Sequence, residues 1–530
     1  IEVGHHQQEK ETDKCVVDSV PLGPILNADQ IVETIAGVVG MSLAANDNKE
    51  DQLANFLRES HAYLIIDNFE HVMAGVSVIQ TLIHNCPSLS ILVTSREKLN
   101  IAKETVHNLR GFNLPHHLKL KEARQQDAIQ LFLQITHKVD WHFRLTEDNL
   151  PQIIAICRKV EGVPLAIELA AAWSRMMSPD EILKYLETNF NLLADSLSHL
   201  PERHRSIRAV FESSWQLLTQ EEQIIYSQLS VFRGGCTQQA IEDMLGASPQ
   251  QTLSLVDKSL IHRYEDNRYF IHELLREYAR NKLDDFPQYS QTVRDRHAQY
   301  FATFLEQRLS TFSIDGKNQS VVVQEINAEY DNIREMWYFA LDKLDFQIIG
   351  QSLETIYYVN QIRGTYLIAF QMFEDVQRAM EHHELQSTRP KLYAELLSMM
   401  AFYAALSNSY NQIVPLAEKV NHLAKQYDLP VEHARVESAL SVHWATIGDL
   451  QKAKRHGKIA VGLYSQLTNI EEQTNAFINL GWTYQLLGDY QSAGQLFSRL
   501  VAENEAKGHI YQAAQGNIWL ALLNNLQGKY

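Results

Sequence analysis

The sequence predicts an α/β domain followed by a long all-α region. We expect a partial parallel sheet, a helical domain, helices that carry a β-hairpin, and finally a helical repeat array. Three observations lead to this prediction. Two short apolar runs near the N-terminus each end in polar residues, the spacing of apolar residues becomes helical after about residue 120, and similar turns recur every 40 residues near the C-terminus. A chain of 530 residues has room for two to four domains.

The parallel sheet is predicted from residues 62–66 (Ala-Tyr-Leu-Ile-Ile) and 89–94 (Leu-Ser-Ile-Leu-Val-Thr), both of which resemble buried strands. Helical segments are expected around 47–60 and 72–85, which gives the alternation of βαβ units. Functional residues of such sheets lie just past the carboxyl ends of the strands, and Asp67 falls at such a position.

The middle of the chain is predicted to be helical. Apolar residues recur at helical spacing from about 120 to 200. Residues 205–283 keep two or three helices and add two short extended segments, 260–264 and 268–271, on either side of a turn. A hairpin that follows helices is typical of the wing of a winged-helix fold.

The repeat array is predicted from one spacing. Asn408, Gly448, Gly488 and Gly528 follow one another at intervals of 40 residues, and a helix with an aromatic residue precedes the last three of these turns. An alanine five residues after the turn indicates close contact between paired helices. This is the construction of a solenoid of the tetratricopeptide (TPR) type, although 40 exceeds its usual period of about 34 residues.

Composition limits the possible partners. A formal net charge of −17 and a pI near 5.7 argue against broad binding of nucleic acid or of anionic membranes. No apolar run approaches the roughly 20 residues that span a bilayer. The four cysteines form no CxxC pair, so we expect neither a zinc site nor a disulfide framework, and a cytoplasmic location is the simpler interpretation.

Three short motifs suggest nucleotide chemistry. Asp67 ends an apolar strand, where a carboxylate can hold the magnesium of a bound nucleotide, although such a residue can also be an ordinary turn or helix cap. Arg96 follows the next strand, where a guanidinium can meet a terminal phosphate or simply lie on the surface. In EGVPLAIELAAAW, Gly162 gives the loop conformational freedom and Pro164 begins a helix. The start of a helix is by itself enough to explain this motif, without any contact to a nucleotide.

The ordered series of these motifs resembles the NB-ARC or AP-ATPase branch of the STAND signalling ATPases, in the form found in bacterial regulators with helical repeats. The resemblance covers nearly the whole chain. The segment NAEYDNIREMWYFAL, residues 327–341, looks like the one that joins such ATPases to their repeats. The implied architecture is a partial P-loop NTPase sheet, a helical domain, a winged helix and a TPR-like α-solenoid.

The resemblance also implies roles for single residues. It implies that ATP or ADP is bound together with Mg²⁺, and that the chain is a signalling switch, off with ADP and on with ATP, with transcription as its output. Its motifs match the magnesium ligand at Asp67, the sensor arginine at Arg96, the adenine-contacting GxP motif at Gly162, Pro164 and Leu165, and the β-phosphate-contacting histidine of the MHD-type motif at His272.

Two departures from the family pattern bear on activity. The sequence contains no GxxxxGK[ST], so we expect the phosphate-binding loop to lie upstream of Ile1 and the sequence as given to bind ATP poorly. Asn68 stands where many relatives carry an acidic catalytic residue. An amide cannot take a proton from water, so hydrolysis is expected to be slow at best, with Glu70 as the possible substitute.

These observations predict five regions and their partners. We expect protein or peptide binding by the repeats, self-association on activation, DNA binding only through a domain outside this sequence, and no membrane contact. The segment 249–259 of the winged helix has Lys258 as its one basic residue, which favours an internal role over DNA binding. The regions are a nucleotide-binding α/β domain at 1–118, a helical domain at 119–204, a winged helix at 205–285, a helical linker at 286–389 and TPR-like repeats at 390–530.

A rival hypothesis from a different class also fits the sequence. In it, the chain is a nucleotide-independent scaffold, in which a degenerate ATPase remnant lies beside a peptide-binding repeat array. The absent phosphate-binding loop and Asn68 favour this hypothesis. It gives no reason for Asp67, Arg96, Pro164 and His272 to occur together.

Overall fold

The computed structural model of the chain describes residues 16–527, except 23–24, 26–27, 42, 44–47, 60–61, 96, 108, 110, 113–118, 194–201, 265–266, 314–318, 408–409 and 468–469. The chain divides into two compact units. The first comprises residues 1–105, 302–328 and 340–530, and the second comprises 106–301 and 329–339.

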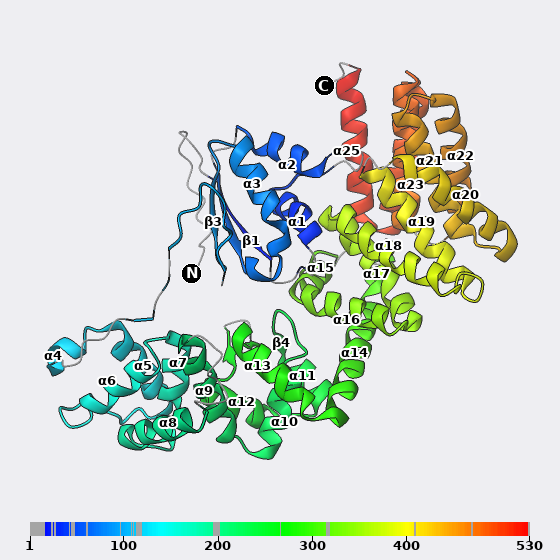
Figure 1. Cartoon of the computed structure of the whole chain (residues 1–530). Helices are drawn as coiled ribbons and strands as arrows, with labels where there is room; N and C mark the ends of the chain where they lie inside the picture. Colours follow the sequence, from blue (N-terminus) through cyan, green and yellow to red (C-terminus); the bar gives the residue numbers. More distant parts are fainter. Residues whose placement is uncertain are drawn as a thin grey trace. The chain divides into compact units, whose positions relative to one another are not determined.

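The N-terminal part of the first unit is a three-stranded parallel sheet in the order β1-β2-β3, with α1, α2 and α3 along one face (Figure 1). The predicted strands at 62–66 and 89–94 are present as β2 and β3, and β1 is a strand that the sequence did not predict. The elements are β1 (Val16–Pro21), η1 (Ala28–Gln30), α1 (Ile31–Val38), α2 (Lys49–Leu57), β2 (Ala62–Asp67), η2 (Phe69–His71), η3 (Met73–Gly75), α3 (Val76–Asn85) and β3 (Ser90–Val93).

Alternate residues of these strands face different surroundings. Leu64 and Ile66 of β2 are fully buried against the three helices, together with Val20 of β1. On the other face Tyr63 and Leu92 are 50% and 62% exposed. The sheet thus buries one face against its helices, as the period of two along a strand requires.

The second unit begins with helices and continues with helices and a small antiparallel sheet of order β4-β6-β5. The predicted hairpin is present as β5 and β6, and the two-residue strand β4 adds to it. The elements are α4 (Leu120–Ala123), α5 (Asp127–Val139), α6 (Leu150–Lys159), α7 (Pro164–Ala172), η4 (Trp173–Arg175), α8 (Pro179–Leu193), α9 (Glu202–Gln216), α10 (Gln220–Leu229), β4 (Cys236–Thr237), α11 (Gln238–Leu245), α12 (Pro249–Asp257), β5 (His262–Arg263), β6 (Arg268–Phe270) and α13 (Glu273–Asp284).

Helices α14 to α18 follow. Two of them, α14 and α16, contribute residues to both units. Their bounds are α14 (Pro287–Ser313), α15 (Gln319–Ala328), α16 (Tyr330–Asp342), α17 (Phe346–Arg363) and α18 (Tyr366–His382).

The C-terminal helices form the predicted repeat array. The first helix of each pair begins 40 residues after the previous one, at Pro390, Pro430, Ile470 and Ile510, and the second helices keep the same interval. Gly448 and Gly488 lie in the left-handed region, with φ of 92° and 74°, as the turns between paired helices require. The helices are α19 (Pro390–Leu406), α20 (Tyr410–Tyr427), α21 (Pro430–Thr446), α22 (Leu450–Tyr464), α23 (Ile470–Leu486), α24 (Tyr490–Lys507) and α25 (Ile510–Leu526).

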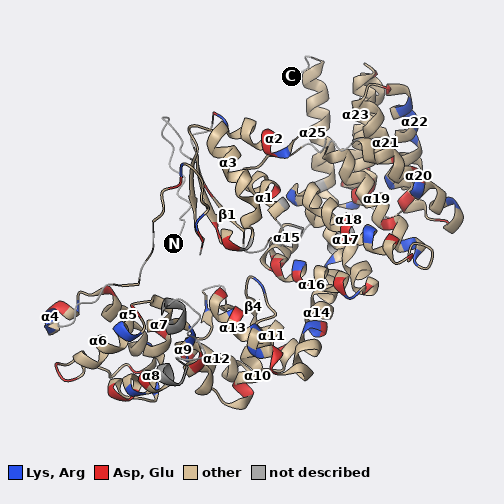
Figure 2. Ribbon diagram, in the orientation of Figure 1, with Lys and Arg blue, Asp and Glu red and all other residues tan. Residues whose placement is uncertain are grey.

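Two features of sequence composition can be followed in the structure. Basic and acidic residues are interspersed along the helices of both units (Figure 2). None of the helices in the described residues is long and apolar enough to cross a membrane.

Candidate nucleotide site

Asp67 is the last residue of β2, and its side chain is exposed at the carboxyl end of the sheet. Its carbonyl oxygen accepts a hydrogen bond from the amide of Leu22, just past the end of β1, at 3.0 Å. The residues that precede it in β2 are alternately buried, so the strand is anchored while its end remains accessible. This is the edge of a parallel sheet at which ligands are bound in open α/β folds.

Thr94 fixes the orientation of the Asp67 carboxylate. The Thr94 hydroxyl donates a hydrogen bond to Oδ1 of Asp67 and accepts one from the amide of Asn68 at 3.0 Å. The backbone of Thr94 adds two bonds: its amide donates to the Ile66 carbonyl at 2.9 Å, and its carbonyl accepts from the Phe69 amide at 3.0 Å. Thr94 is therefore a site residue that sequence reasoning did not single out, although it ends the predicted strand two residues before Arg96.

Glu70 follows Asp67 by three residues, in the turn after β2. Asn68 adopts the left-handed conformation, with φ of 63°, and so reverses the chain into the short helix η2. Glu70 lies within η2 and is half-buried. Arg96 lies outside the described residues, so its predicted contact with a phosphate stays a prediction.

Gly162 occupies a position that admits no other residue without rearrangement. It has a φ of 66°, and a Cβ added there would lie 2.1 Å from the carbonyl oxygen of Phe112. The Gly162 carbonyl accepts a hydrogen bond from the Phe112 amide at 2.8 Å, so the two backbones run in direct contact. Phe112 belongs to the segment that leads from the sheet into the helices, and sequence reasoning did not identify this contact.

Pro164 and Leu165 open α7 directly after this loop. Pro164 takes the first helical position, where a proline loses no hydrogen bond, and its side chain is exposed. Leu165 is 9% exposed, and most of the other side chains of α7 are buried. Of the predicted adenine-contacting residues, Pro164 is thus the exposed one, whereas Gly162 and Leu165 are buried.

His272 lies between the hairpin and α13. It is the N-cap residue of α13, and its Nδ1 accepts a hydrogen bond from the amide of Leu274 at 3.3 Å. Its side chain is exposed. The next residue, Glu273, pairs with Arg276 at 2.5 Å and with Arg233 at 3.6 Å. Burial, and then the neighbouring Arg276, lower the pKa of the Arg233 guanidinium from its ordinary value.

The predicted residues fall into two groups. Asp67 and Glu70 belong to the first unit, where Asp67 is joined to Thr94. Gly162, Pro164, Leu165 and His272 belong to the second unit, in two separate segments of it. The Thr94 contact could have been suspected from a hydroxyl at the end of the neighbouring strand, whereas no local pattern marks Phe112.

The chemistry of these residues fits a nucleotide with magnesium. Mg²⁺ in nucleotide sites is commonly held by one or two carboxylates, with water and phosphate oxygens as its other ligands. The exposed and oriented carboxylate of Asp67 meets that requirement. Among the described residues no group of three or more His, Cys, Asp or Glu side chains could hold a metal ion by itself.

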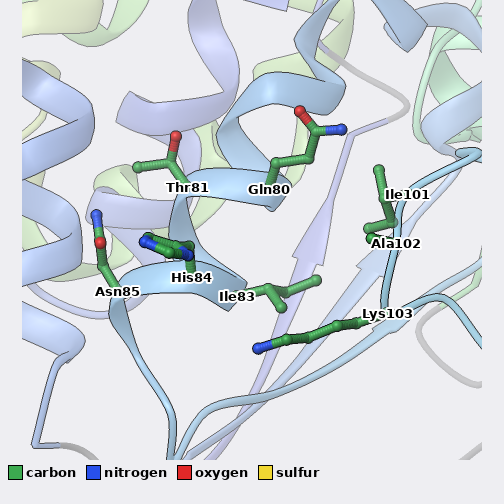
Figure 3. A pocket seen from close by; sticks show the side chains of 8 residues that line it. All are labelled: Gln80, Thr81, Ile83, His84, Asn85, Ile101, Ala102 and Lys103. Atoms are coloured by element: carbon green, nitrogen blue, oxygen red, sulfur yellow. The ribbon is translucent and has the colours of Figure 1, made fainter.

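A surface cavity elsewhere in the first unit is not part of this site. Its volume is about 450 Å³, and Figure 3 shows that its lining comes from α3 on one side and from residues 101–103 on the other. None of the predicted site residues lines it. The lining residues are Gln80, Thr81, Ile83, His84, Asn85, Ile101, Ala102 and Lys103.

Comparisons with known proteins identify mycobacterial relatives. No protein-family model matches the chain. A protein of Mycobacterium tuberculosis named "Putative HTH-type transcriptional regulator" is 32% identical over 331 residues, which are 60% of this chain and 36% of the relative. The chain thus spans about a third of the length of that relative. A second protein of the same organism, named "Uncharacterized protein", is 30% identical over 278 residues, which are 50% of this chain and 68% of the relative.

One solved structure is similar over a larger part of the chain. It is a Signal Transduction ATPase with Numerous Domains (STAND) protein with a tetratricopeptide repeat sensor from Pyrococcus horikoshii. The match covers 90% of this chain and 74% of that chain, with 15% sequence identity and a TM-score of 0.37. A TM-score and a sequence identity this low assign neither a fold nor a function to the chain.

Proposed function

We propose that this chain, which belongs to the same family as the second of these mycobacterial proteins, acts as a nucleotide-controlled signalling switch of the STAND class that regulates transcription. The observation that carries the proposal is the Asp67 carboxylate, which the Thr94 hydroxyl orients at the carboxyl end of the parallel sheet. A carboxylate that only capped a turn would not need a partner from the neighbouring strand. The name of the first relative supports transcription as the output.

Each predicted residue has a role in the proposed switch. Asp67 would hold the magnesium ion, Arg96 would contact the terminal phosphate, and Glu70 would accept the proton of the attacking water if hydrolysis occurs. Gly162, Pro164 and Leu165 would contact the adenine, and His272 would contact the β-phosphate. A bound nucleotide supplies the phosphate charge that distinguishes the two states. Hydrolysis is expected to be slow, since Asn68 follows Asp67.

The switch requires that ADP and ATP favour different conformations. A ligand shifts a two-state equilibrium only through contacts that differ between the states. Contacts from Asp67, Pro164 and His272 would provide that difference. We propose that the ADP-bound state is off and that exchange for ATP releases the His272 contact and permits self-association.

The repeat array would be the sensor. Pairs of helices at a constant 40-residue interval form extended surfaces that bind proteins or peptides in many solenoids. We retain the five predicted regions, 1–118, 119–204, 205–285, 286–389 and 390–530, as the proposed domains. DNA would be bound by a domain outside this sequence.

The proposal is tested by the nucleotide content of the protein expressed from its complete natural gene. We expect ADP to be retained on purification. The His272→Ala variant should lose ADP or exchange it for ATP more readily, whereas Asp67→Asn should weaken the magnesium-dependent part of ATP binding. His382→Ala, a change at an exposed histidine of α18, is the matched control and should behave as the natural protein. If the natural protein binds no nucleotide, the switch hypothesis is wrong and the nucleotide-independent scaffold is favoured.

A further inference from the structure

The start of α16, which belongs to the second unit, is bound to the hairpin by a buried ion pair. The guanidinium of Arg268, in β6, contacts both carboxylate oxygens of Glu329, which immediately precedes α16, with 3.1 Å between Nη2 and Oε2. The side chains are 10% and 9% exposed. Two charges so far removed from water are stable only while they stay paired, so this contact fixes Glu329 to β6.

Asn332 adds a second contact from the first turn of α16. Its Nδ2 donates to the Gly235 carbonyl at 2.9 Å and to Oε2 of Glu329 at 2.8 Å, and its Oδ1 accepts from the Arg233 amide at 2.7 Å. The side chain is fully buried. Asn332 thus holds the loop that precedes β4, and it also orients the carboxylate that binds Arg268.

A third contact runs from α16 to the residue after His272. The Arg233 side chain lies 3.5 Å from the carboxylate of Glu335 and 3.6 Å from that of Glu273. Glu273 is the first residue of α13 and follows His272 directly. Arg233 therefore connects the second turn of α16 to the N-terminus of α13.

His272 is bracketed by these contacts. Arg268, four residues before it, pairs with Glu329, and Glu273, one residue after it, is linked through Arg233 to Glu335. Both ends of the segment that carries His272 are therefore held by the same helix. A displacement of α16 must either move this segment or separate a buried ion pair.

The other end of α16 leads to α17, the first of the two helices that precede the repeats. Only residues 343–345 separate it from α17, and this connection is closed by a 2.8 Å hydrogen bond from the Asp345 amide to the Ala340 carbonyl. Asp345 also caps α17 with its side chain. A connection with so few residues and with its own hydrogen bonds can absorb little movement.

We infer that α16 is the linkage through which occupancy of the repeat array changes the position of His272. The inference rests on the proposed function, because it assigns His272 the task of sensing the nucleotide. Glu329, Asn332 and Glu335 are positioning residues in this scheme, since they act on His272 through Arg268 and Glu273. A partner bound to the repeats would act by pulling or rotating α16, which has to carry the His272 segment with it.

The test measures hydrogen exchange and ADP retention in the full-length natural protein. Glu329→Gln removes the charge of the buried pair and Glu335→Gln breaks the more exposed link, so the second variant remains informative if the first does not fold. Glu325→Gln is the matched control, because its partner Arg308 lies on α14 and neither residue contacts the hairpin in the described structure. We expect amide exchange in 268–276 to rise about tenfold in the first two variants and to stay unchanged in the control.

The two readouts separate this inference from the proposed function. Exchange in 268–276 needs no nucleotide, so unchanged exchange in both Glu329→Gln and Glu335→Gln would overturn the linkage by itself. If His272→Ala weakens ADP retention, Glu329→Gln should weaken it too, and should add nothing in the His272→Ala background. The linkage would also be overturned if His272→Ala lowers the ADP affinity while Glu329→Gln and Glu335→Gln leave it unchanged. If His272→Ala leaves the ADP affinity unchanged while amide exchange in 268–276 rises in the two glutamate variants, the proposed function is wrong and the mechanical link is still supported.

Discussion

The hydroxyl of Thr94 donates a hydrogen bond to the carboxylate of Asp67, so the residue that follows β3 orients the residue that ends β2. The same hydroxyl accepts a bond from the amide of Asn68. A threonine side chain can serve both groups because its oxygen is donor and acceptor at once. The position of the candidate magnesium ligand therefore depends on a residue 27 positions away in sequence.

Thr94→Val should release the Asp67 carboxylate. Valine keeps the shape of threonine and lacks its hydroxyl, so both hydrogen bonds are lost while the packing stays similar. Because the site is exposed, we expect a loss of about 1 kcal/mol in the free energy of unfolding and faster amide exchange at 67–69. Thr94→Ser, which keeps the hydroxyl, is the control. A loss of stability in Thr94→Ser without one in Thr94→Val would show that the methyl group, and not the hydroxyl, is what matters.

Gly162→Ala should destabilise the second unit more than Gly246→Ala does. Both glycines have similar φ, 66° and 68°, but a Cβ at Gly162 would meet the Phe112 backbone, whereas nothing lies within 4 Å of one at Gly246. The conformation alone costs about 1 kcal/mol, and the backbone clash should add at least about 2 kcal/mol. Urea unfolding of the two variants measures the difference. Similar midpoints would mean that the Phe112 segment moves aside freely.

Arg435→Met should strongly destabilise the repeats. Arg435 is 1% exposed, and its guanidinium donates to Glu472 at 2.6 Å and to Ser398 at 2.8 Å, so it joins α19, α21 and α23. Its removal leaves the buried Glu472 without a cation, at an expected cost of about 3–5 kcal/mol. The measurement is chemical unfolding, with helicity as the signal.

Two further variants control for the loss of the Arg435 charge. Arg499→Met breaks an exposed pair with Glu503 on α24 and should cost less than about 1 kcal/mol. In the double variant Arg435→Met/Glu472→Gln no unpaired charge remains, so much of the stability should return. A double variant as unstable as the single one would show that packing, and not charge, makes Arg435 necessary.

His297 should make the second unit less stable in mild acid. Burial lowers the pKa of His297 to about 4 from 6.5, although Glu335 and a hydrogen bond with Asn332 oppose this effect. The unfolded chain therefore takes up a proton between about pH 6.5 and pH 4 that the folded chain does not, and stability falls as the pH is lowered through this window. The full effect is about 3 kcal/mol.

The contribution of His297 is isolated by a variant that cannot titrate. In His297→Gln the unfolding free energy should fall less between pH 7 and pH 4.5 than in the natural protein, while other groups titrate equally in both. Parallel pH profiles for the two proteins would contradict the buried, neutral state of His297.

The sequence predicted those features that repeat or alternate along the chain. Strand β2 follows from its apolar run, and the turns at Gly448 and Gly488 follow from the 40-residue interval. Strand β4 has two residues, too few to leave a pattern. The contacts of Thr94, Phe112 and Asn332 were not predictable either, because they join side chains or backbones that meet only after folding.

The segment around Glu329 is the clearest example of a contact that the sequence could not predict. Its residues were recognised as a joining segment before the repeats, but nothing local indicates that Glu329 pairs with Arg268, 61 residues earlier. A lone glutamate before a helix is normally a solvated residue. Only the three-dimensional structure shows that it is buried beside an arginine of the hairpin.

The constant interval of the repeats has an evolutionary consequence. In a solenoid each pair of helices contacts mainly its neighbours, so a whole 40-residue unit can be duplicated or deleted without disturbing the rest of the chain. The length of the array can then change by recombination in discrete steps, and homologues that share the same N-terminal region can differ in repeat number. A gene built in this way can acquire a new recognition specificity while the rest of the protein stays as it was.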